Sequence, residues 1–232
     1  MTIGIIGAMD PEIEHLTKDL RDIHKQTIGF AEFISGKLAD RDVVIVRCGI
    51  GKVSAGAVTA LLISHYNVTC VINTGSAGGI GHGLKVGDTV FSTKVAYHDA
   101  DLTVFGYKRG QMAAHPLYFD ADAQLISLAE EAALSLTDFK GAIKKGVVLS
   151  GDQFISDPDK KLSLVETFPE ALVVEMEGAA IAQICNDFCV PFLVIRAVSD
   201  CAEEGNAMTY EEFLPLASQN SAKLVLALVA RL

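Results

Sequence analysis

The sequence has few cysteines and no long apolar run. No apolar stretch approaches the roughly 20 residues that span a bilayer, and a strand pattern begins at residue 2, where a signal peptide would show a basic start and an apolar core. The cysteines form an odd set without the short paired spacings of a zinc site, and no histidine lies near Cys185 and Cys189 in the sequence to complete one. We therefore expect reduced thiols in the core, no metal and a cytoplasmic protein.

Basic residues are also scarce. The chain has 19 Lys and Arg against 29 Asp and Glu, a formal charge of -10, and no run of basic residues. This balance argues against a nucleic-acid or anionic-membrane surface, so a small molecule is the expected partner. At 232 residues and 50% hydrophobic, the chain is long enough for one sizeable core. Because it shows no repeat and no linker, we predict a single domain over 1–232.

Apolar runs of strand length alternate with helical patterns, which indicates an α/β layered fold. The strands are predicted at 2–7, 43–47, 69–73, 146–149, 172–175 and 192–198, and the helices at 11–24, 53–66, 121–135, 176–188 and 210–232. Segments 28–35 and 38–46 are predicted to form an antiparallel hairpin that turns at Gly36-Lys37, so the sheet should be mixed.

Carboxylates stand at the ends of three apolar runs. Glu175 and Glu177 end one run, Asp200 ends another, and Glu12 follows the first run of the chain. Placing a carboxylate at the edge of a core is costly unless it is used or paired. Because ligands bind at the carboxyl ends of strands in open α/β sheets, these acids are predicted to share a crevice. For Glu12 the alternative is stabilisation of a helix that starts at Asp10-Pro11.

Three strands are predicted to lead into glycine-containing turns that can present amides to a ligand, at 48–52, 73–79 and 150–154. A P-loop would need Gly in place of Val46 and Ser or Thr in place of Val53, and the dinucleotide pattern lacks its third glycine. Both nucleotide motifs are therefore disfavoured. A simple tight connection remains an alternative for 75–83.

An ordered set of motifs along nearly the whole chain resembles the 5'-methylthioadenosine/S-adenosylhomocysteine nucleosidases, within the nucleoside phosphorylase/nucleosidase superfamily. The motifs are Gly4-Ile5-Ile6-Gly7-Ala8-Met9 with Glu12, Gly49-Ile50-Gly51-Lys52, Asn73-Thr74-Gly75-Ser76-Ala77-Gly78, Tyr97-His98-Asp99-Ala100-Asp101, Phe105-Gly106-Tyr107, Ser150-Gly151-Asp152, Val174-Glu175-Met176-Glu177 and Arg196-Ala197-Val198-Ser199-Asp200. The resemblance implies a nucleoside phosphorylase-like α/β fold, a three-layer α/β/α sandwich with a central twisted mixed sheet.

The resemblance also implies the activity: hydrolysis of the N-glycosidic bond of 5'-thio-substituted adenosines, and of 5'-deoxyadenosine, in methionine salvage, without a metal or organic cofactor. Asp200 would be the general acid at adenine N7, Glu12 would activate the attacking water, and Glu177 would bind the ribose hydroxyls. The other implied substrate-binding residues are Met9, Ile50, Ser76, Phe154, Ile155, Glu175, Met176, Arg196, Ser199 and Tyr210.

The implied reaction explains why these residue types are needed. Adenine leaves poorly as an anion, and general acid catalysis typically contributes about 10² to 10⁴-fold. Asp200 must then carry a proton at working pH; burial favours the neutral form of a carboxyl group, and the apolar run before Asp200 is compatible with burial. Fixed carboxylates such as Glu12 and Glu177 would stabilise the positive charge that develops on the ribose.

The resemblance further suggests a homodimer in which Leu102, Phe105 and Pro116 of one subunit close the alkylthio pocket of the other; a contact within a monomeric core is the alternative. Three alternatives to the activity remain: a phosphorylase, a nucleosidase for another adenosine derivative such as aminofutalosine, and a purine-binding module without turnover. A phosphorylase would need cationic groups around its phosphate, and few candidates are present.

Overall fold

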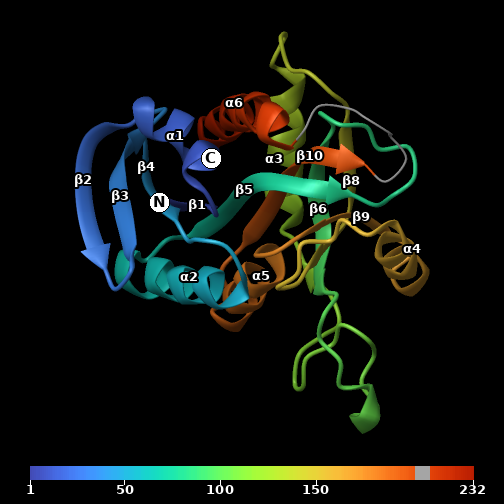
Figure 1. The fold of residues 1–232 in the computed structure, drawn as a ribbon. Helices are drawn as coiled ribbons and strands as arrows, with labels where there is room; N and C mark the ends of the chain where they lie inside the picture. The colour runs from blue at the N-terminus through green and yellow to red at the C-terminus, as the bar shows by residue number, and fades with distance from the viewer. Residues whose placement is uncertain (202–209) are drawn as a thin grey trace.

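A mixed β-sheet lies at the centre of the molecule (Figure 1). The computed structural model describes residues 1–201 and 210–232, and for 210–216 it describes the backbone alone. Within these residues the strands are β1 (Thr2–Gly7), β2 (Arg21–Ile28), β3 (Ala31–Leu38), β4 (Arg41–Arg47), β5 (Cys70–Gly79), β6 (Thr89–Tyr97), β7 (Phe119–Asp120), β8 (Ile143–Ser150), β9 (Ala171–Glu175) and β10 (Phe192–Cys201). The helices are α1 (Asp10–Lys18), α2 (Lys52–Tyr66), α3 (Ala123–Leu134), α4 (Pro158–Thr167), α5 (Gly178–Asp187) and α6 (Tyr210–Val229), with a short 3₁₀ turn, η1 (Thr103–Phe105).

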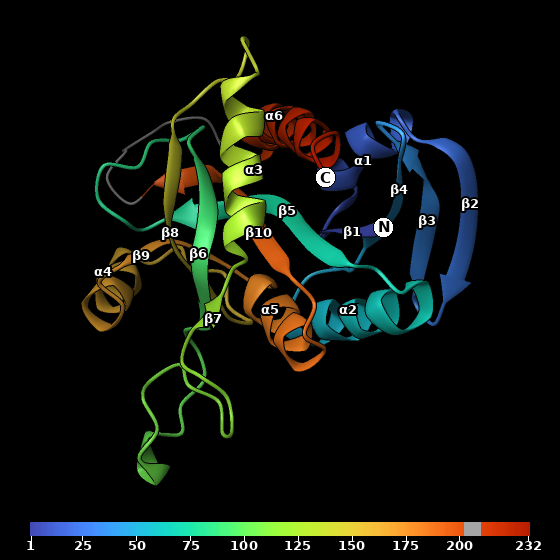
Figure 2. The ribbon, with the colours of Figure 1, turned by 180° about the vertical axis from the view of Figure 1, so that it is seen from behind.

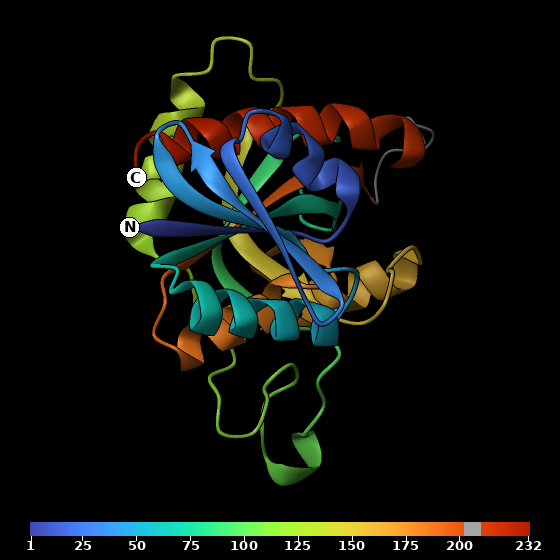
Figure 3. The same ribbon diagram turned by 90° about the vertical axis from the view of Figure 1, so that its left-hand side faces the viewer.

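Helices cover both faces of the sheet. Helices α1, α3 and α6 pack together on one face, and α2 packs against α5 on the other (Figures 1 and 3). Strand β1 runs parallel to β4 and β5, whereas β3 runs antiparallel to β4. The predicted three-layer α/β/α sandwich with a mixed sheet is therefore confirmed.

The central strands are apolar because both of their faces are covered. Side chains of β1, the first half of β5 and most of β10 are buried, as in a parallel sheet that lies between two helical layers. Strand β10 pairs with β5 in parallel and with β6 antiparallel, and β8 and β9 complete a closed ring of five strands. The carboxyl ends of β1, β5, β9 and β10 thereby come together.

The predicted helix over 11–24 is wrong in its second half. Helix α1 ends at Lys18, and 21–28 form the edge strand β2, which pairs with β3. Seven of its eight residues are exposed, so this polar strand carries no alternation of buried and exposed side chains. The backbone pairing along the edge of the sheet, which the sequence pattern does not show, decides its conformation.

The predicted turn at Gly36-Lys37 is also wrong. Gly36 lies inside β3, and the chain turns at Ala39 and Asp40, whose φ angles are 48° and 62°. A Cβ on Gly36 would approach the carbonyl oxygen of Arg21 to 2.5 Å, beside an irregularity in the β2–β3 register. Glycine at this position allows two strands to approach closely, a use that sequence alone does not distinguish from a turn.

Strands β6 and β7 and helix α4 were also not predicted from the sequence. Between β6 and β7, residues 98–118 project away from the body of the molecule (Figures 1 and 2). We refer to 98–118 as the arm. None of the helices in the described part of the chain is long and apolar enough to cross a membrane.

Candidate active site

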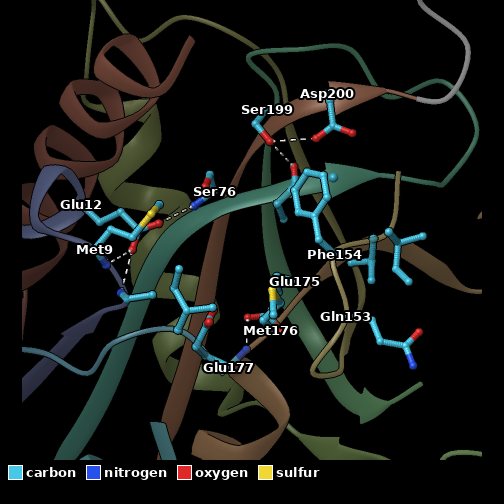
Figure 4. A pocket seen from close by; sticks show the side chains of 16 residues that line it. Met9, Glu12, Ser76, Gln153, Phe154, Glu175, Met176, Glu177, Ser199 and Asp200 are labelled. Carbon is cyan, nitrogen blue, oxygen red and sulfur yellow. Dashed lines mark hydrogen bonds between the residues drawn. The ribbon is translucent and has the colours of Figure 1, made fainter. Parts of the chain in front are cut away.

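A pocket of about 230 Å³ lies where the carboxyl ends of these strands meet. It is lined by eleven of the residues that the resemblance implied: Met9, Glu12, Ile50, Ser76, Phe154, Ile155, Glu175, Met176, Glu177, Ser199 and Asp200. Glu12 and Asp200 stand on opposite sides of the pocket, and Glu177 lies below them in the view of Figure 4. Segments separated by nearly two hundred residues thus form one site.

Glu12 is held by backbone amides at the start of α1. Its Oε2 accepts hydrogen bonds from the amides of Ala8 at 2.7 Å and Met9 at 3.0 Å, and its Oε1 accepts one from the amide of Ser76 at 3.1 Å. A carboxylate has about four acceptor positions, so one remains for a further donor, such as a water molecule. Stabilisation of the helix start and presentation to the pocket, which the sequence offered as alternatives, therefore occur together.

The predicted glycine turn at 73–79 is wrong, because these residues continue strand β5. A Cβ on Gly75 would lie 2.0 Å from Nη1 of Arg196 and 2.8 Å from Oε1 of Glu12. Glycine is required at position 75 because the side chains of Arg196 and Glu12 occupy the space that a Cβ atom would fill. The turns at 48–52 and 150–154 are confirmed, and Gly49 and Gly51 have φ angles of 80° and 96°.

Arg196 lies beneath the pocket and does not line it. Its side chain is 1% exposed. Its Nη2 contacts Oε2 of Glu175, donates to Oδ1 of Asn73 at 2.8 Å and lies 3.4 Å from Oε2 of Glu177. A buried charge is tolerated only when it has partners of opposite charge. Arg196 is such a partner for Glu175 and Glu177, the two acids on the floor of the pocket.

The two acids on the floor of the pocket differ in their surroundings. Glu175 accepts hydrogen bonds from the hydroxyl of Ser150 and from the amides of Glu177 and Gly178, at the start of α5. Glu177 accepts one from the amide of Gly51 at 2.9 Å. Burial, followed by the charge of Glu175, raises the pKa of Glu177 to about 7. Glu175 thus supports the structure, while Glu177 is the acid of this pair with capacity for a ligand.

Asp200 is less sheltered than its sequence predicted. Its side chain is 40% exposed, and its Oδ2 accepts a hydrogen bond from Nζ of Lys161 at 2.9 Å. The hydroxyl of Ser199 lies 3.0 Å from its Oδ1 and 3.1 Å from the carbonyl oxygen of Ala77 (Figure 4). The expectation of a buried acid is therefore wrong: the Asp200 side chain is partly exposed, and Lys161 is its ion-pair partner.

Apolar side chains form the mouth of the pocket. Phe154 is 71% exposed and Ile50 is 60% exposed, whereas Ile155 is buried. Exposed apolar side chains that border a pocket are typical of a ligand site. The side chain of Tyr210 lies outside the described residues.

The three residues predicted to serve a partner subunit do not reach the pocket of their own chain. Leu102, Phe105 and Pro116 lie on the arm, and Phe105 is 74% exposed. Its neighbour Val104 is 84% exposed. The alternative of a core contact within one chain is therefore wrong for Phe105.

Three residues of the site had no role in the sequence analysis. Asn73 and Ser150 stood only as members of motifs, although both are fully buried and bind Arg196 and Glu175. Lys161 had no signal, because α4 was not predicted. Had α4 been predicted, a lysine on its inward face would have been the one indication that Asp200 has a basic partner.

Comparisons with known proteins identify relatives of this chain. A family model described as the phosphorylase superfamily matches residues 2–230. Proteins named 5'-methylthioadenosine/S-adenosylhomocysteine nucleosidase from Shewanella halifaxensis and Shewanella denitrificans are 46% and 47% identical over 232 residues, which cover 100% of both chains. A structure of the nucleosidase of this name from Neisseria meningitidis, in complex with methylthio-immucillin-A, is 43% identical with a TM-score of 0.95 and covers 100% of this chain and 99% of its own. A Colwellia psychrerythraea nucleosidase in complex with adenine is 43% identical with a TM-score of 0.94, covering 100% and 96%.

Proposed function

Because the chain belongs to the 5'-methylthioadenosine/S-adenosylhomocysteine nucleosidase family, within the phosphorylase superfamily, we propose that it hydrolyses the N-glycosidic bond of these two nucleosides. The products are adenine and the matching 5'-substituted ribose, and 5'-deoxyadenosine is a further expected substrate. The observation that carries the proposal is the placement of Glu12 and Asp200 on opposite sides of one pocket, with Glu177 on its floor. The adenine and methylthio-immucillin-A bound by the relatives support the same ligand class.

The reaction divides acid and base work between the two sides of the pocket. Asp200 gives a proton to N7 of adenine while the electrons of the bond between C1' and N9 pass to the base. Water bound to the remaining acceptor position of Glu12 then attacks C1', and Glu12 takes its proton. Each proton transfer is general acid-base catalysis, worth about 10² to 10⁴-fold. Carboxylates already fixed in the pocket stabilise the positive charge that develops on the sugar.

The other pocket residues bind the substrate. Glu177 accepts hydrogen bonds from the ribose hydroxyls, and Met176 packs beside the sugar. Phe154 stacks on adenine, and the backbone of Ile155 binds its polar edge. Met9 and Ile50 line the ribose and thioether end. Ser76, Glu175 and Arg196 order the water and the acidic floor, and Ser199 orients Asp200.

Water is the proposed nucleophile, because the pocket is unsuited to phosphate. Among the described residues that line it there is no lysine, arginine or histidine. Arg196 is committed to Glu175 and Glu177, and Arg47 pairs with Asp10 at 3.2 Å. The carboxylate of Glu12 would repel a phosphate ion.

A homodimer is part of the proposal. The arm projects from the body (Figure 1), and Val104 and Phe105 of its 3₁₀ turn η1 are exposed. At its base a second cavity, of about 300 Å³, is lined by Met112 of the arm and by Val53, which is 83% exposed. Such an apolar surface suits a second copy of the chain, whose arm would supply Leu102, Phe105 and Pro116 to the pocket.

Phe105→Asp should yield a monomer in light scattering and a raised KM for 5'-methylthioadenosine. A dimer with an unchanged KM would contradict this arrangement.

A cytoplasmic location and a role in methionine salvage complete the proposal. None of the five cysteines, all of which lie in the described part of the chain, forms a disulfide, which fits a reducing compartment.

The activity is tested by adenine release from a panel of 5'-substituted adenosines, aminofutalosine included, with and without phosphate. We expect free thioribose at a rate that phosphate does not change; formation of the ribose 1-phosphate would show a phosphorylase instead.

Asp200→Asn and Glu12→Gln should each lower kcat by several orders of magnitude without loss of the fold, as seen by circular dichroism. Glu166→Gln, an exposed acid on α4, is the matched control. Adenine binding without release by the unaltered protein would indicate a binding module.

A further inference from the structure

The ion pair between Lys161 and Asp200 joins two segments that flank the purine end of the pocket. Lys161 comes from α4, which follows the loop carrying Phe154 and Ile155, and Asp200 comes from the end of β10. The Lys161 side chain is only 6% exposed, and its Nζ lies 2.9 Å from Oδ2 of Asp200. A buried ammonium group needs such a partner, and Asp200 is the hydrogen-bond acceptor that Lys161 has in the described part of the chain.

The groups around the Asp200 carboxyl distinguish its two oxygen atoms. Lys161 approaches Oδ2 from α4, and the hydroxyl of Ser199 approaches Oδ1 from β10 itself. From β5 and β9, the nearby residues are Gly78 and Val174, which carry no charge. Lys161 therefore forms an ion pair with this acid and approaches only one of its two oxygen atoms.

We propose that Lys161 is a positioning residue for the general acid: it fixes Oδ2 of Asp200, leaves Oδ1 to deliver the proton, and stabilises the carboxylate left after the transfer. This inference rests on the proposed function. The step is balanced: the bond between Oδ1 and its proton breaks, the proton bonds to N7, and the negative charge stays on Asp200 beside the ammonium of Lys161. Ser199 can follow this change because its single proton lies within reach of both Oδ1 and the Ala77 carbonyl oxygen.

Lys161 acts on the rate of the proton transfer, because negative charge forms on Asp200 beside its ammonium group as the proton leaves. Removing the cation should therefore lower kcat. A hydrogen bond to a charged group corresponds to a loss of about ten- to a hundredfold in kcat.

The experiment compares Lys161→Met, Lys161→Arg and Lys160→Met over pH 5 to 10. Lys161→Met keeps much of the side-chain volume, Lys161→Arg keeps the charge, and Lys160 is an exposed neighbour on the same helix. We expect Lys161→Met alone to show the lower kcat. Thermal unfolding checks that each variant is folded. A Lys161→Met profile equal to that of the unaltered protein would overturn the proposal.

Two further measurements separate an effect on the acid from general damage to the site. A 4-nitrophenyl riboside with the same 5'-methylthio group has a leaving group that needs no protonation, so Lys161→Met should cleave it at the normal rate. Equal slowing of this substrate and of 5'-methylthioadenosine would indicate a structural role and overturn the proposal. Adenine binding, followed by calorimetry, requires no turnover. In Lys161→Met the affinity for adenine should fall, because Oδ2 of Asp200 is no longer held in place. An unchanged affinity counts against Lys161 even if the unaltered protein releases no adenine, which is the separate failure of the proposed function.

Discussion

Replacing Arg196 by methionine should strongly destabilise the protein, because it leaves the acids of the pocket floor without their cation. Arg196 is 1% exposed, and it faces Glu175 and Glu177, whose side chains are 2% and 5% exposed. Removing one partner of a buried ion pair typically costs about 3–5 kcal/mol. For a domain of this size each kcal/mol corresponds to about 2–4 °C in Tm, so we expect Tm to fall by about 6–20 °C.

The pH dependence of this loss identifies its cause. Without the guanidinium group, the pKa of Glu177 should rise above the value of about 7 that it has beside Arg196. A carboxyl whose folded-state pKa is raised binds its proton more tightly when folded, so stability is retained at low pH and lost as pH rises. The deficit of Arg196→Met should therefore be smaller at pH 5 than at pH 8.

Urea unfolding at the two pH values measures both quantities. The matched control is Arg47→Met, which breaks an ion pair with Asp10 whose side chains are 54% and 75% exposed and should change stability by about 0–1 kcal/mol. A deficit for Arg196→Met no larger than that of the control, or one that is equal at pH 5 and pH 8, would refute the reasoning.

Two further predictions concern the same site. The free energy of unfolding of the unaltered protein should contain a component that falls between pH 5 and pH 8, because the folded-state pKa of Glu177, about 7, exceeds its ordinary value of 4.5. In denaturation curves, Glu177→Gln should remove up to about 3 kcal/mol of this change. An identical pH slope in the variant would contradict the assignment. Gly75→Ala should abolish adenine release and lower Tm, because its Cβ would lie 2.0 Å from Nη1 of Arg196. The control Gly56→Ala on α2, where the nearest atom is 3.8 Å from the added Cβ, should retain activity and gain up to about 1 kcal/mol in the free energy of unfolding. Normal activity in Gly75→Ala would show that the strand can shift to make room.

Several parts of the fold were predictable because a local pattern determines them. The apolar runs of β1 and β10 must be buried on both faces, and α2 and α6 carry enough apolar residues to cover the sheet. The errors fall where a distant contact decides the structure. Strand β2 is polar and exists through its pairing with β3, and Gly36 serves that close pairing in place of a turn.

The site shows the same division. The ordered motifs placed Glu12, Glu177 and Asp200 at strand ends, and the fold brought them to one pocket as predicted. No local pattern indicated Lys161, whose α4 was not predicted, or the exposure of Asp200, because both depend on how α4 packs against the end of β10.

The sequence by itself determined the family, the layered α/β fold and the types of residue that carry the proposed chemistry, since apolar periodicity and ordered motifs are local properties of the chain. Only the tertiary structure decided the charge environment of each acid: Arg196 beneath Glu175 and Glu177, and Lys161 beside Asp200. The physical reason is that the electrostatic energy of a group depends on distances and burial across the whole fold, which the linear order of residues does not specify.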